Sequence, residues 1–257
     1  SGVAPHANVV MYAACCTGSA LSAARDQVVI DGVDVVNYSI GSSGATPDPW
    51  GSSFALQWLA VRDAGIFVAT SAGNNGHDSA TLGSPGDLPW MTTIGASSHD
   101  LAYVNSVINM SGGDTAPPAD IIGRSPTVGY GPAPIVHAID FGDALCLNPF
   151  PAGTFSGEIV VCDRGTIARV QKGANVLAGG DGGMVLAEVN PDGGIGGLLV
   201  DTHVLPAVHI ATPDGDVLRT WLSTGSGHTA TIAGTTIEQG PQYADIMAEF
   251  SSRGQNR

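Results

Sequence analysis

Positive charge is the scarcest property of this chain. Of its 257 residues only 9 are lysine or arginine, against 23 aspartates and glutamates, and Lys172 is the only lysine. A chain with a net charge of -14 repels the phosphate backbone of nucleic acids, so nucleic acid is not an expected partner. We interpret the acidity as a source of solubility.

Long apolar runs are also missing, and no segment reaches the length of a membrane-spanning helix. Hydrophobic residues make up 43% of the chain and charged residues only 12%, which argues against a disordered polypeptide and supplies a sizeable core. The 36 glycines and 16 prolines indicate short elements joined by many turns.

Cysteine is sparse, and none of the four cysteines has the spacing of zinc ligands. No acidic cluster matches a calcium site either, so we expect neither a metal nor a cofactor. Cys15 and Cys16 are adjacent, and adjacent cysteines rarely bond each other. Cys146 and Cys162 bracket a turn-rich stretch, and we favour a disulfide between them over two buried thiols. That disulfide would indicate an oxidising compartment.

The first hundred residues alternate between strand and helix patterns. Leu21, Ala24 and Val28 have helical spacing, with Ser19 or Ser22 as a candidate cap. Predicted strands cover residues 8–13, 33–40, 66–70 and 90–96, and predicted helices cover 19–30 and about 52–64. This alternation with short links predicts an α/β fold with a parallel sheet.

A different pattern follows residue 99. Residues 111–157 are rich in glycine, proline and aspartate and show no long helix. Predicted strands then cover 158–162, 183–187, 205–210 and 228–232, with helices over 167–177 and from 212 onward. This is a second, smaller α+β unit. Residues 245–250 read as a strand that returns to the first unit, so the second unit is predicted to be an insertion.

One short string carries candidate chemistry. Residues 66–69 are apolar and lead into Ser-Ala-Gly-Asn-Asn-Gly at 71–76, a strand followed by a tight, exposed turn. Asn74 would then lie at the carboxyl end of a parallel strand, where open α/β sheets bind ligands. An amide there can donate a hydrogen bond to an oxyanion, but the same string is also an ordinary turn signal.

The order of several strings resembles the subtilisin-like serine proteases, the S8 family of subtilases. The resembling strings are Ser-Gly-Val-Ala-Pro at 1–5, Asp-Gly-Val-Asp-Val-Val-Asn-Tyr-Ser-Ile-Gly at 31–41, residues 71–76, and Phe-Ser-Ser-Arg-Gly at 250–254. The intervening unit resembles the protease-associated domain inserted in many secreted subtilases. It does so at residues 157–165, 169–174 and 205–208.

The resemblance implies a fold and a division of the chain. Residues 1–118 would be a partial, parallel-sheet, subtilisin-like core, 119–236 an inserted α+β protease-associated domain, and 237–257 the return to the core. It also implies a secreted serine endopeptidase that hydrolyses peptide bonds through an acyl-enzyme.

Site residues follow by matching positions. Asn74 matches the oxyanion-hole asparagine of the family. Ser39, Ile40 and Gly41 match the strand that pairs with the substrate backbone. The opposite wall of the substrate cleft is matched by Ser71, Ala72 and Gly73. An extended peptide would add to this exposed edge, and small residues would leave room for its side chain.

The catalytic triad has no counterpart in these residues. The family's contexts for serine (Gly-Thr-Ser-Met), histidine (His-Gly-Thr-His) and aspartate (Asp-Ser/Thr-Gly) do not occur, and none of the seven histidines lies in such a context. Gln255 also stands where the family usually has proline. The resemblance therefore implies an internal segment of a protease that is inactive alone.

Two kinds of partner follow from that reading. The expected partners are the remaining core segments of the protease and a peptide or protein substrate, with self-association as a further way to cover exposed apolar edges. The alternative is a non-catalytic peptide-binding or protein-interaction module built on a protease-associated domain.

Overall fold

A computed structural model describes residues 3–14, 17–76, 78–190 and 198–254. The chain divides into two compact units, which are Ser1–Ala96 with Phe250–Arg257, and Ser97–Glu249. Each unit has its own buried hydrophobic core. No helix among the described residues is both long enough and apolar enough to cross a bilayer.

The first unit is built on a three-stranded parallel sheet in the order β1-β2-β3. Its elements are α1 (Gly18–Ile30), β1 (Val35–Tyr38), α2 (Ser53–Asp63), β2 (Phe67–Ser71) and β3 (Thr92–Ile94). Val36 lies opposite Val68, and Thr70 lies opposite Thr93. The predicted α/β alternation with a parallel sheet is confirmed.

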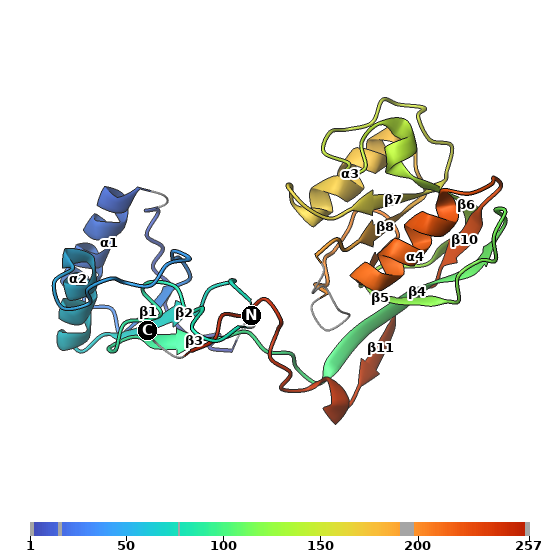
Figure 1. Cartoon of the computed structure of the whole chain (residues 1–257). Coiled ribbons are helices and arrows are strands. Elements are labelled where there is room, and N and C mark those ends of the chain that lie inside the picture. The colour runs from blue at the N-terminus through green and yellow to red at the C-terminus, as the bar shows by residue number, and fades with distance from the viewer. Residues whose placement is uncertain (1–2, 15–16, 77, 191–197, 255–257) are drawn as a thin grey trace. The chain divides into compact units, whose positions relative to one another are not determined.

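Helices α1 and α2 lie side by side and pack against one face of this sheet (Figure 1). Val28 of α1 and Trp58 of α2 are buried with Val68 of β2. On the other face Val35, Phe67 and Ile94 keep 60%, 43% and 53% of their surface exposed. The first unit therefore presents an uncovered apolar sheet face.

Two local predictions for this unit need correction. Helix α1 begins after Thr17, whose hydroxyl accepts a hydrogen bond from the Ala20 N–H at 3.3 Å, so neither Ser19 nor Ser22 is the cap. Residues 8–13 form no strand, and Val9 and Met11 are each 84% exposed. A strand needs a neighbouring edge, and among the described residues β1 pairs only with β2.

The second unit is an eight-stranded mixed sheet in the order β10-β6-β7-β8-β9-β5-β4-β11. Strand β10 also pairs with β4, which closes seven of these strands into a ring. The strands are β4 (Leu101–Ser111), β5 (Ile121–Arg124), β6 (Tyr130–His137), β7 (Ile159–Asp163), β8 (Gly183–Ala187), β9 (Ala207–Ile210), β10 (Thr229–Ile232) and β11 (Thr236–Gln239). Strands β6 to β9 are mutually parallel, and the other pairings are antiparallel.

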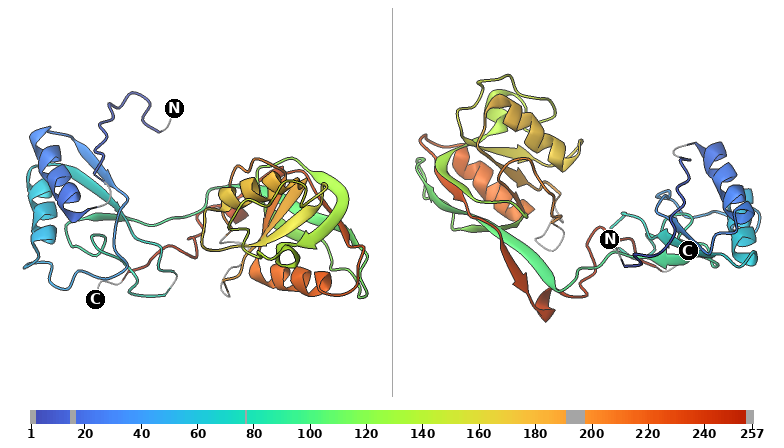
Figure 2. Two further views of the ribbon diagram at one scale, coloured as in Figure 1. Left: turned by 90° about the horizontal axis from the view of Figure 1, so that it is seen from above. Right: turned by 180° about the vertical axis from the view of Figure 1, so that it is seen from behind.

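Helices α3 (Arg169–Gly179) and α4 (Thr212–Leu222) cover opposite faces of the parallel strands (Figure 2). Alternate residues of β7 supply the two cores, because successive side chains of a strand point to opposite faces. Ile159 and Val161 lie in the core that contains Leu218 and Trp221 of α4. The α+β character predicted for this unit is confirmed. The described residues of this unit also form two short 3-10 helices, η1 (Ala138–Phe141) and η3 (Pro241–Tyr243).

A disulfide joins Cys146 and Cys162, the pair that the sequence pattern favoured. Their Cα atoms are 5.8 Å apart, and both residues are fully buried in the core under α3. The bond ties the loop after η1 to strand β7. Cys15 and Cys16 lie outside the described residues.

The second unit extends beyond residues 119–236 at both ends. Strand β4 pairs with β5, β10 and β11, which draws residues 97–118 into this unit. After β11, residues 245–250 form only a single bridge between Met247 and Ser97, so the strand predicted there is wrong. The boundaries after residues 118 and 236 were placed by resemblance to the protease-associated domain of the family. They differ from the limits of the compact unit and remain predictions.

Candidate functional site

A pocket of about 430 Å³ lies beside the carboxyl ends of β1 and β2 in the first unit. Tyr38 and Thr70 are register partners, so the segments that leave the two strands are neighbours. These segments form the two walls, and a third segment completes the lining. The lining residues are Ser39, Ile40, Gly41, Ser42, Ser43, Ser71, Ala72, Gly73, Asn74, Asn75, Gly83 and Ser84.

All seven residues that the sequence assigned to oxyanion or substrate binding line this one pocket. Parallel strands place their carboxyl ends at the same edge of a sheet, which is why two strings more than 30 residues apart meet here. None of the described lining residues is ionisable or aromatic. The lining offers hydroxyl, amide and backbone groups to a neutral ligand.

Two glycines let the pocket segments approach closely. A Cβ at Gly83 would lie 1.9 Å from the Ser42 carbonyl oxygen, and one at Gly41 would lie 2.8 Å from that of Ser84. The Ser42 N–H donates to the Ser84 carbonyl oxygen at 2.9 Å. Backbone contact at this distance leaves no space for a side chain, so the wall and the third segment form one rigid surface.

Asn74 lies in the loop that follows β2, and its side chain is exposed. Among the described residues no group forms a hydrogen bond with its side-chain amide. The neighbouring Asn75 is held instead, because its Nδ2 donates to the carbonyl oxygens of Thr81 at 3.3 Å and Ser43 at 3.4 Å. The Asn74 amide is thus a free donor on an anchored loop.

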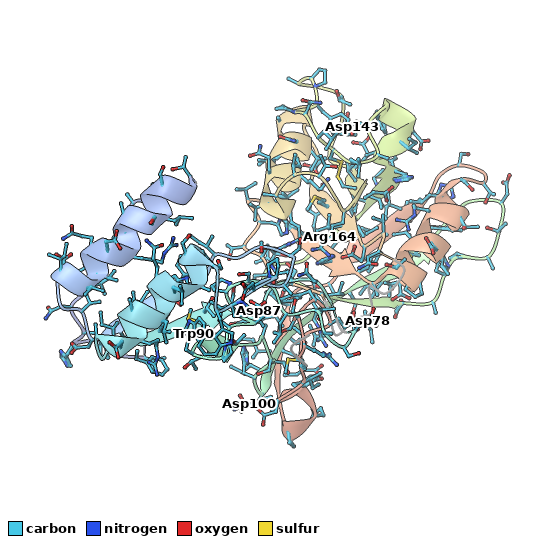
Figure 3. All side chains as sticks on the ribbon, turned by 60° about the vertical axis from the view of Figure 1, so that its left-hand side comes forward. Asp78, Asp87, Trp90, Asp100, Asp143 and Arg164 are labelled. Atoms are coloured by element: carbon cyan, nitrogen blue, oxygen red, sulfur yellow. A yellow bond between two sulfur atoms is a disulfide. The ribbon has the colours of Figure 1, made fainter. Side chains whose placement is uncertain are left out.

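Sequence reasoning missed the support behind the pocket. The Thr46 hydroxyl lies 2.6 Å from the Ser84 hydroxyl and donates to the Asp87 carboxylate at 3.0 Å. The Thr46 N–H also donates to Asp87, which is only 9% exposed (Figure 3). Asp87 is therefore a buried, hydrogen-bonded residue that holds the segment behind the pocket. Gly-Ser-Pro-Gly at 83–86 marks a turn, but no local signal says which segment that turn meets.

The second unit carries ion pairs at the carboxyl ends of its parallel strands. Arg164 follows β7 (Figure 3). It pairs with Glu188, which follows β8. Burial alone would raise the pKa of Glu188. The nearby His209 imidazole, whose Nε2 lies 3.7 Å from the carboxylate, and hydrogen bonds from Arg164 and two backbone amides outweigh burial and lower the pKa to about 2. No three or more His, Cys, Asp or Glu side chains within the described ranges are arranged to hold a metal ion.

Asp181, in the turn between α3 and β8, is a buried acid of a different kind. It is 6% exposed, and neither carboxylate oxygen has a hydrogen-bond partner among the described residues. Burial, with a smaller contribution from the nearby charge of Glu158, raises the pKa of Asp181 to about 7. This carboxylate destabilises the fold once it ionises.

Comparison with protein-family models matches residues 1–257 to the Subtilase family. Among curated proteins, the subtilisin-like protease SBT1.4 of Arabidopsis thaliana is 35% identical over 263 residues, covering 100% of this chain and 33% of that protein. The subtilisin-like protease SBT1.7 of the same plant is 34% identical over 276 residues, covering 99% and 34%. The chain therefore belongs to the subtilase family, as its sequence blocks predicted.

The chain spans about a third of the length of these relatives. Among solved structures, an aminopeptidase from Aneurinibacillus sp. strain AM-1 is 21% identical, with a TM-score of 0.29 over 56% of this chain and 32% of that chain. A likeness at that level supports no argument about this chain.

Proposed function

We propose that this chain is a segment of a secreted subtilisin-like serine endopeptidase, in which it supplies the oxyanion hole and the walls of the substrate cleft. The observation that carries the proposal is the Asn74 amide, which has no hydrogen-bond partner among the described residues and lies at a pocket lined by residues 39–41 on one side and 71–73 on the other. Family membership supports the reaction class.

Each residue group has a defined part in the proposed reaction. An extended substrate lies between the two walls and adds its backbone to the strand end at residues 39–41. A serine hydroxyl attacks the scissile carbonyl carbon, and the carbonyl oxygen gains a negative charge. Asn74 Nδ2 donates a hydrogen bond to that oxygen. The amine then leaves with a proton, and water hydrolyses the resulting ester.

The serine, histidine and aspartate of this reaction have no matching string within residues 1–257. We assign them to other segments of the full-length protein, which makes the chain inactive alone. The uncovered sheet face with Val35, Phe67 and Ile94 supports this assignment, because those segments or a second copy would cover it.

The substrate side chain is inferred from the pocket. The pocket has a volume of about 430 Å³, and its described lining residues are neutral and mostly small. It accommodates large apolar side chains, and these described residues offer no charge to pair with an ionised one. Peptide bonds that follow large apolar residues are the substrates we expect.

Residues 119–236 are proposed to be a protease-associated domain inserted in the core. This assignment rests on the sequence strings that resemble a protease-associated domain. The separate compact unit at Ser97–Glu249 is consistent with an insertion. The disulfide between Cys146 and Cys162 supports secretion, because such bonds persist in oxidising compartments.

A serine-directed fluorophosphonate tests the proposal. The full-length protein should be labelled covalently at a single serine, and residues 1–257 produced alone should not. A folded full-length protein that is never labelled would refute the proposal.

The second candidate function is a peptide-binding module without catalysis. It is favoured by one observation, namely that the described residues line a pocket without any triad residue among them. The intact mass of the native protein separates the two functions. A native polypeptide with the mass of residues 1–257 favours the binding module, and a mass about three times larger favours the protease.

A further inference from the structure

The loop that carries Asn74 is tied to a segment from the far end of the chain. The Gly76 N–H donates to the Phe250 carbonyl oxygen at 3.0 Å, and the Thr81 N–H donates to that of Arg253 at 3.0 Å. The Arg253 N–H in turn donates to the Thr81 hydroxyl at 2.9 Å. Residues 250–253 thus run along the 73–81 loop and belong to the same compact unit.

Ser252 makes the two contacts that bracket Asn74. Its hydroxyl oxygen accepts a hydrogen bond from the Asn75 N–H at 2.9 Å, although the two residues are 177 positions apart. Its own N–H donates to the Gly73 carbonyl oxygen at 3.0 Å. A single residue, only 4% exposed, therefore fixes the backbone on both sides of Asn74.

The turn at Gly73 is shaped around this serine. Gly73 has a φ of +102°, a conformation that side chains other than glycine rarely adopt. A Cβ at Gly73 would lie 3.0 Å from the Ser252 hydroxyl oxygen. The hydroxyl is packed directly against the turn, so it limits both the position and the direction of the residue that follows.

We propose that Ser252 is a positioning residue for the Asn74 amide, a role that rests on the function proposed above. Stabilisation of an oxyanion requires a donor that is already in place when charge develops, because any reorganisation then costs rate. The exposed Asn74 side chain has no partner of its own among the described residues, so its direction depends on its backbone.

Ser251 provides a matched control for Ser252. It is the adjacent serine, it is 1% exposed, and its hydroxyl oxygen accepts a hydrogen bond from the Ala96 N–H at 3.0 Å. The change Ser251→Ala therefore removes one buried hydroxyl and one hydrogen bond to the backbone, as Ser252→Ala does. It differs in leaving the contacts around Asn74 intact.

The test measures kcat and KM of the full-length protein on a peptide amide with a large apolar residue before the scissile bond. Ser252→Ala should lower kcat about fivefold to tenfold, the equivalent of one hydrogen bond, with KM within about twofold. Ser251→Ala should leave kcat within about twofold of wild type. A Ser252→Ala enzyme with wild-type kcat, or with a loss matched by Ser251→Ala, overturns the proposal.

A double-mutant cycle separates positioning from general destabilisation. In an Asn74→Ala background the donor is absent, so Ser252→Ala should have no further effect on kcat. An undiminished fivefold to tenfold loss in that background would overturn the positioning role. If the wild-type protein hydrolyses the peptide and Asn74→Ala slows hydrolysis, that undiminished loss refutes only the positioning role of Ser252 and leaves the proposed function standing. If the folded wild-type protein is inert, the proposed function and this role fail together.

Folding is monitored independently of activity. If Ser252→Ala does not fold, Ser252→Cys replaces the hydroxyl with a thiol, which accepts hydrogen bonds weakly, and should show the same loss of kcat.

Hydrogen exchange at single amides of the full-length protein gives a second readout. Exchange at the Asn75 amide should accelerate in the variant relative to the Gly76 amide, which bonds to Phe250. Equal protection at Asn75 in both proteins would overturn the proposal.

Discussion

Replacing Asp181 with asparagine should stabilise the second unit at alkaline pH. Asp181 is buried at 6% exposure without a described hydrogen-bond partner, and its pKa is raised from 3.8 to about 7 by burial and then by the charge of Glu158. Because the unfolded chain ionises near pH 3.8, the folded state binds the proton more tightly between these two values.

The sign and size of the effect follow from that difference in pKa. The free energy of unfolding of the wild-type protein should fall as the pH rises from about 4 to about 7, and the full penalty should be present above that range. A pKa difference of roughly 3 between the folded and unfolded states lowers the free energy of unfolding by up to about 4 kcal/mol. Asparagine has nearly the same shape and no charge, so Asp181→Asn removes the penalty at pH 8 and changes little at pH 4.

The assay is a urea series with pulsed hydrogen exchange, read on peptides from α3 and β8 so that the second unit is followed by itself. The exposed Asp120→Asn variant is the matched control and should shift the midpoint little at either pH. A stability gain that is equal at pH 4 and pH 8, or a loss at pH 8, would refute the reasoning about Asp181.

Three further predictions concern other parts of the molecule. Glu188→Gln should remove up to about 3 kcal/mol of stability at neutral pH, because the wild-type pKa of about 2 lies below the usual 4.5. That contribution should disappear as the pH falls from 4.5 toward 2. A difference in the free energy of unfolding between wild type and variant that persists at pH 2 would contradict it. Gly83→Ala should disrupt the pocket and lower the urea midpoint of the first unit, whereas Gly44→Ala, where a Cβ meets nothing within 4 Å, should not. Equal midpoints for the two variants would count against the close approach at Gly83. Limited proteolysis of the isolated chain should cleave the first unit, with its uncovered Val35 and Phe67, before Ser97–Glu249. Cleavage at equal rates would contradict the expected difference in stability.

Elements with strong local signals could be predicted from the sequence. Helices α1 to α4 and strands β1, β2, β7 and β8 fall close to their predicted ranges, because apolar spacing and capping are local properties. Strands β4, β5, β6 and β11 were missed. Strand β6 contains Gly131 and Pro132, and it forms because β7 and β10 pair with it on either side. Pairing with distant strands leaves little trace in a short window of sequence.

The same distinction applies to the candidate site. Its walls follow from two short strings, because parallel strands deliver their carboxyl ends to one edge. The contacts that support the walls join Thr46 to Asp87, 41 positions away, and Asn75 to Ser252, 177 positions away. No periodicity or turn signal encodes such distances. They depend on the return of residues 250–253 to the first unit.

Asn74 as the oxyanion donor is tested most directly by the rate at which a fluorophosphonate labels the full-length protein. The reaction passes through a charged oxygen at phosphorus, which the Asn74 amide should stabilise as it does a peptide oxyanion. We expect Asn74→Ala to slow labelling about 10²- to 10³-fold, a magnitude measured when a subtilisin loses its oxyanion-hole asparagine and not worked out from this structure. Equal labelling rates for the folded wild-type and Asn74→Ala proteins, or no labelling of either, would contradict the assignment.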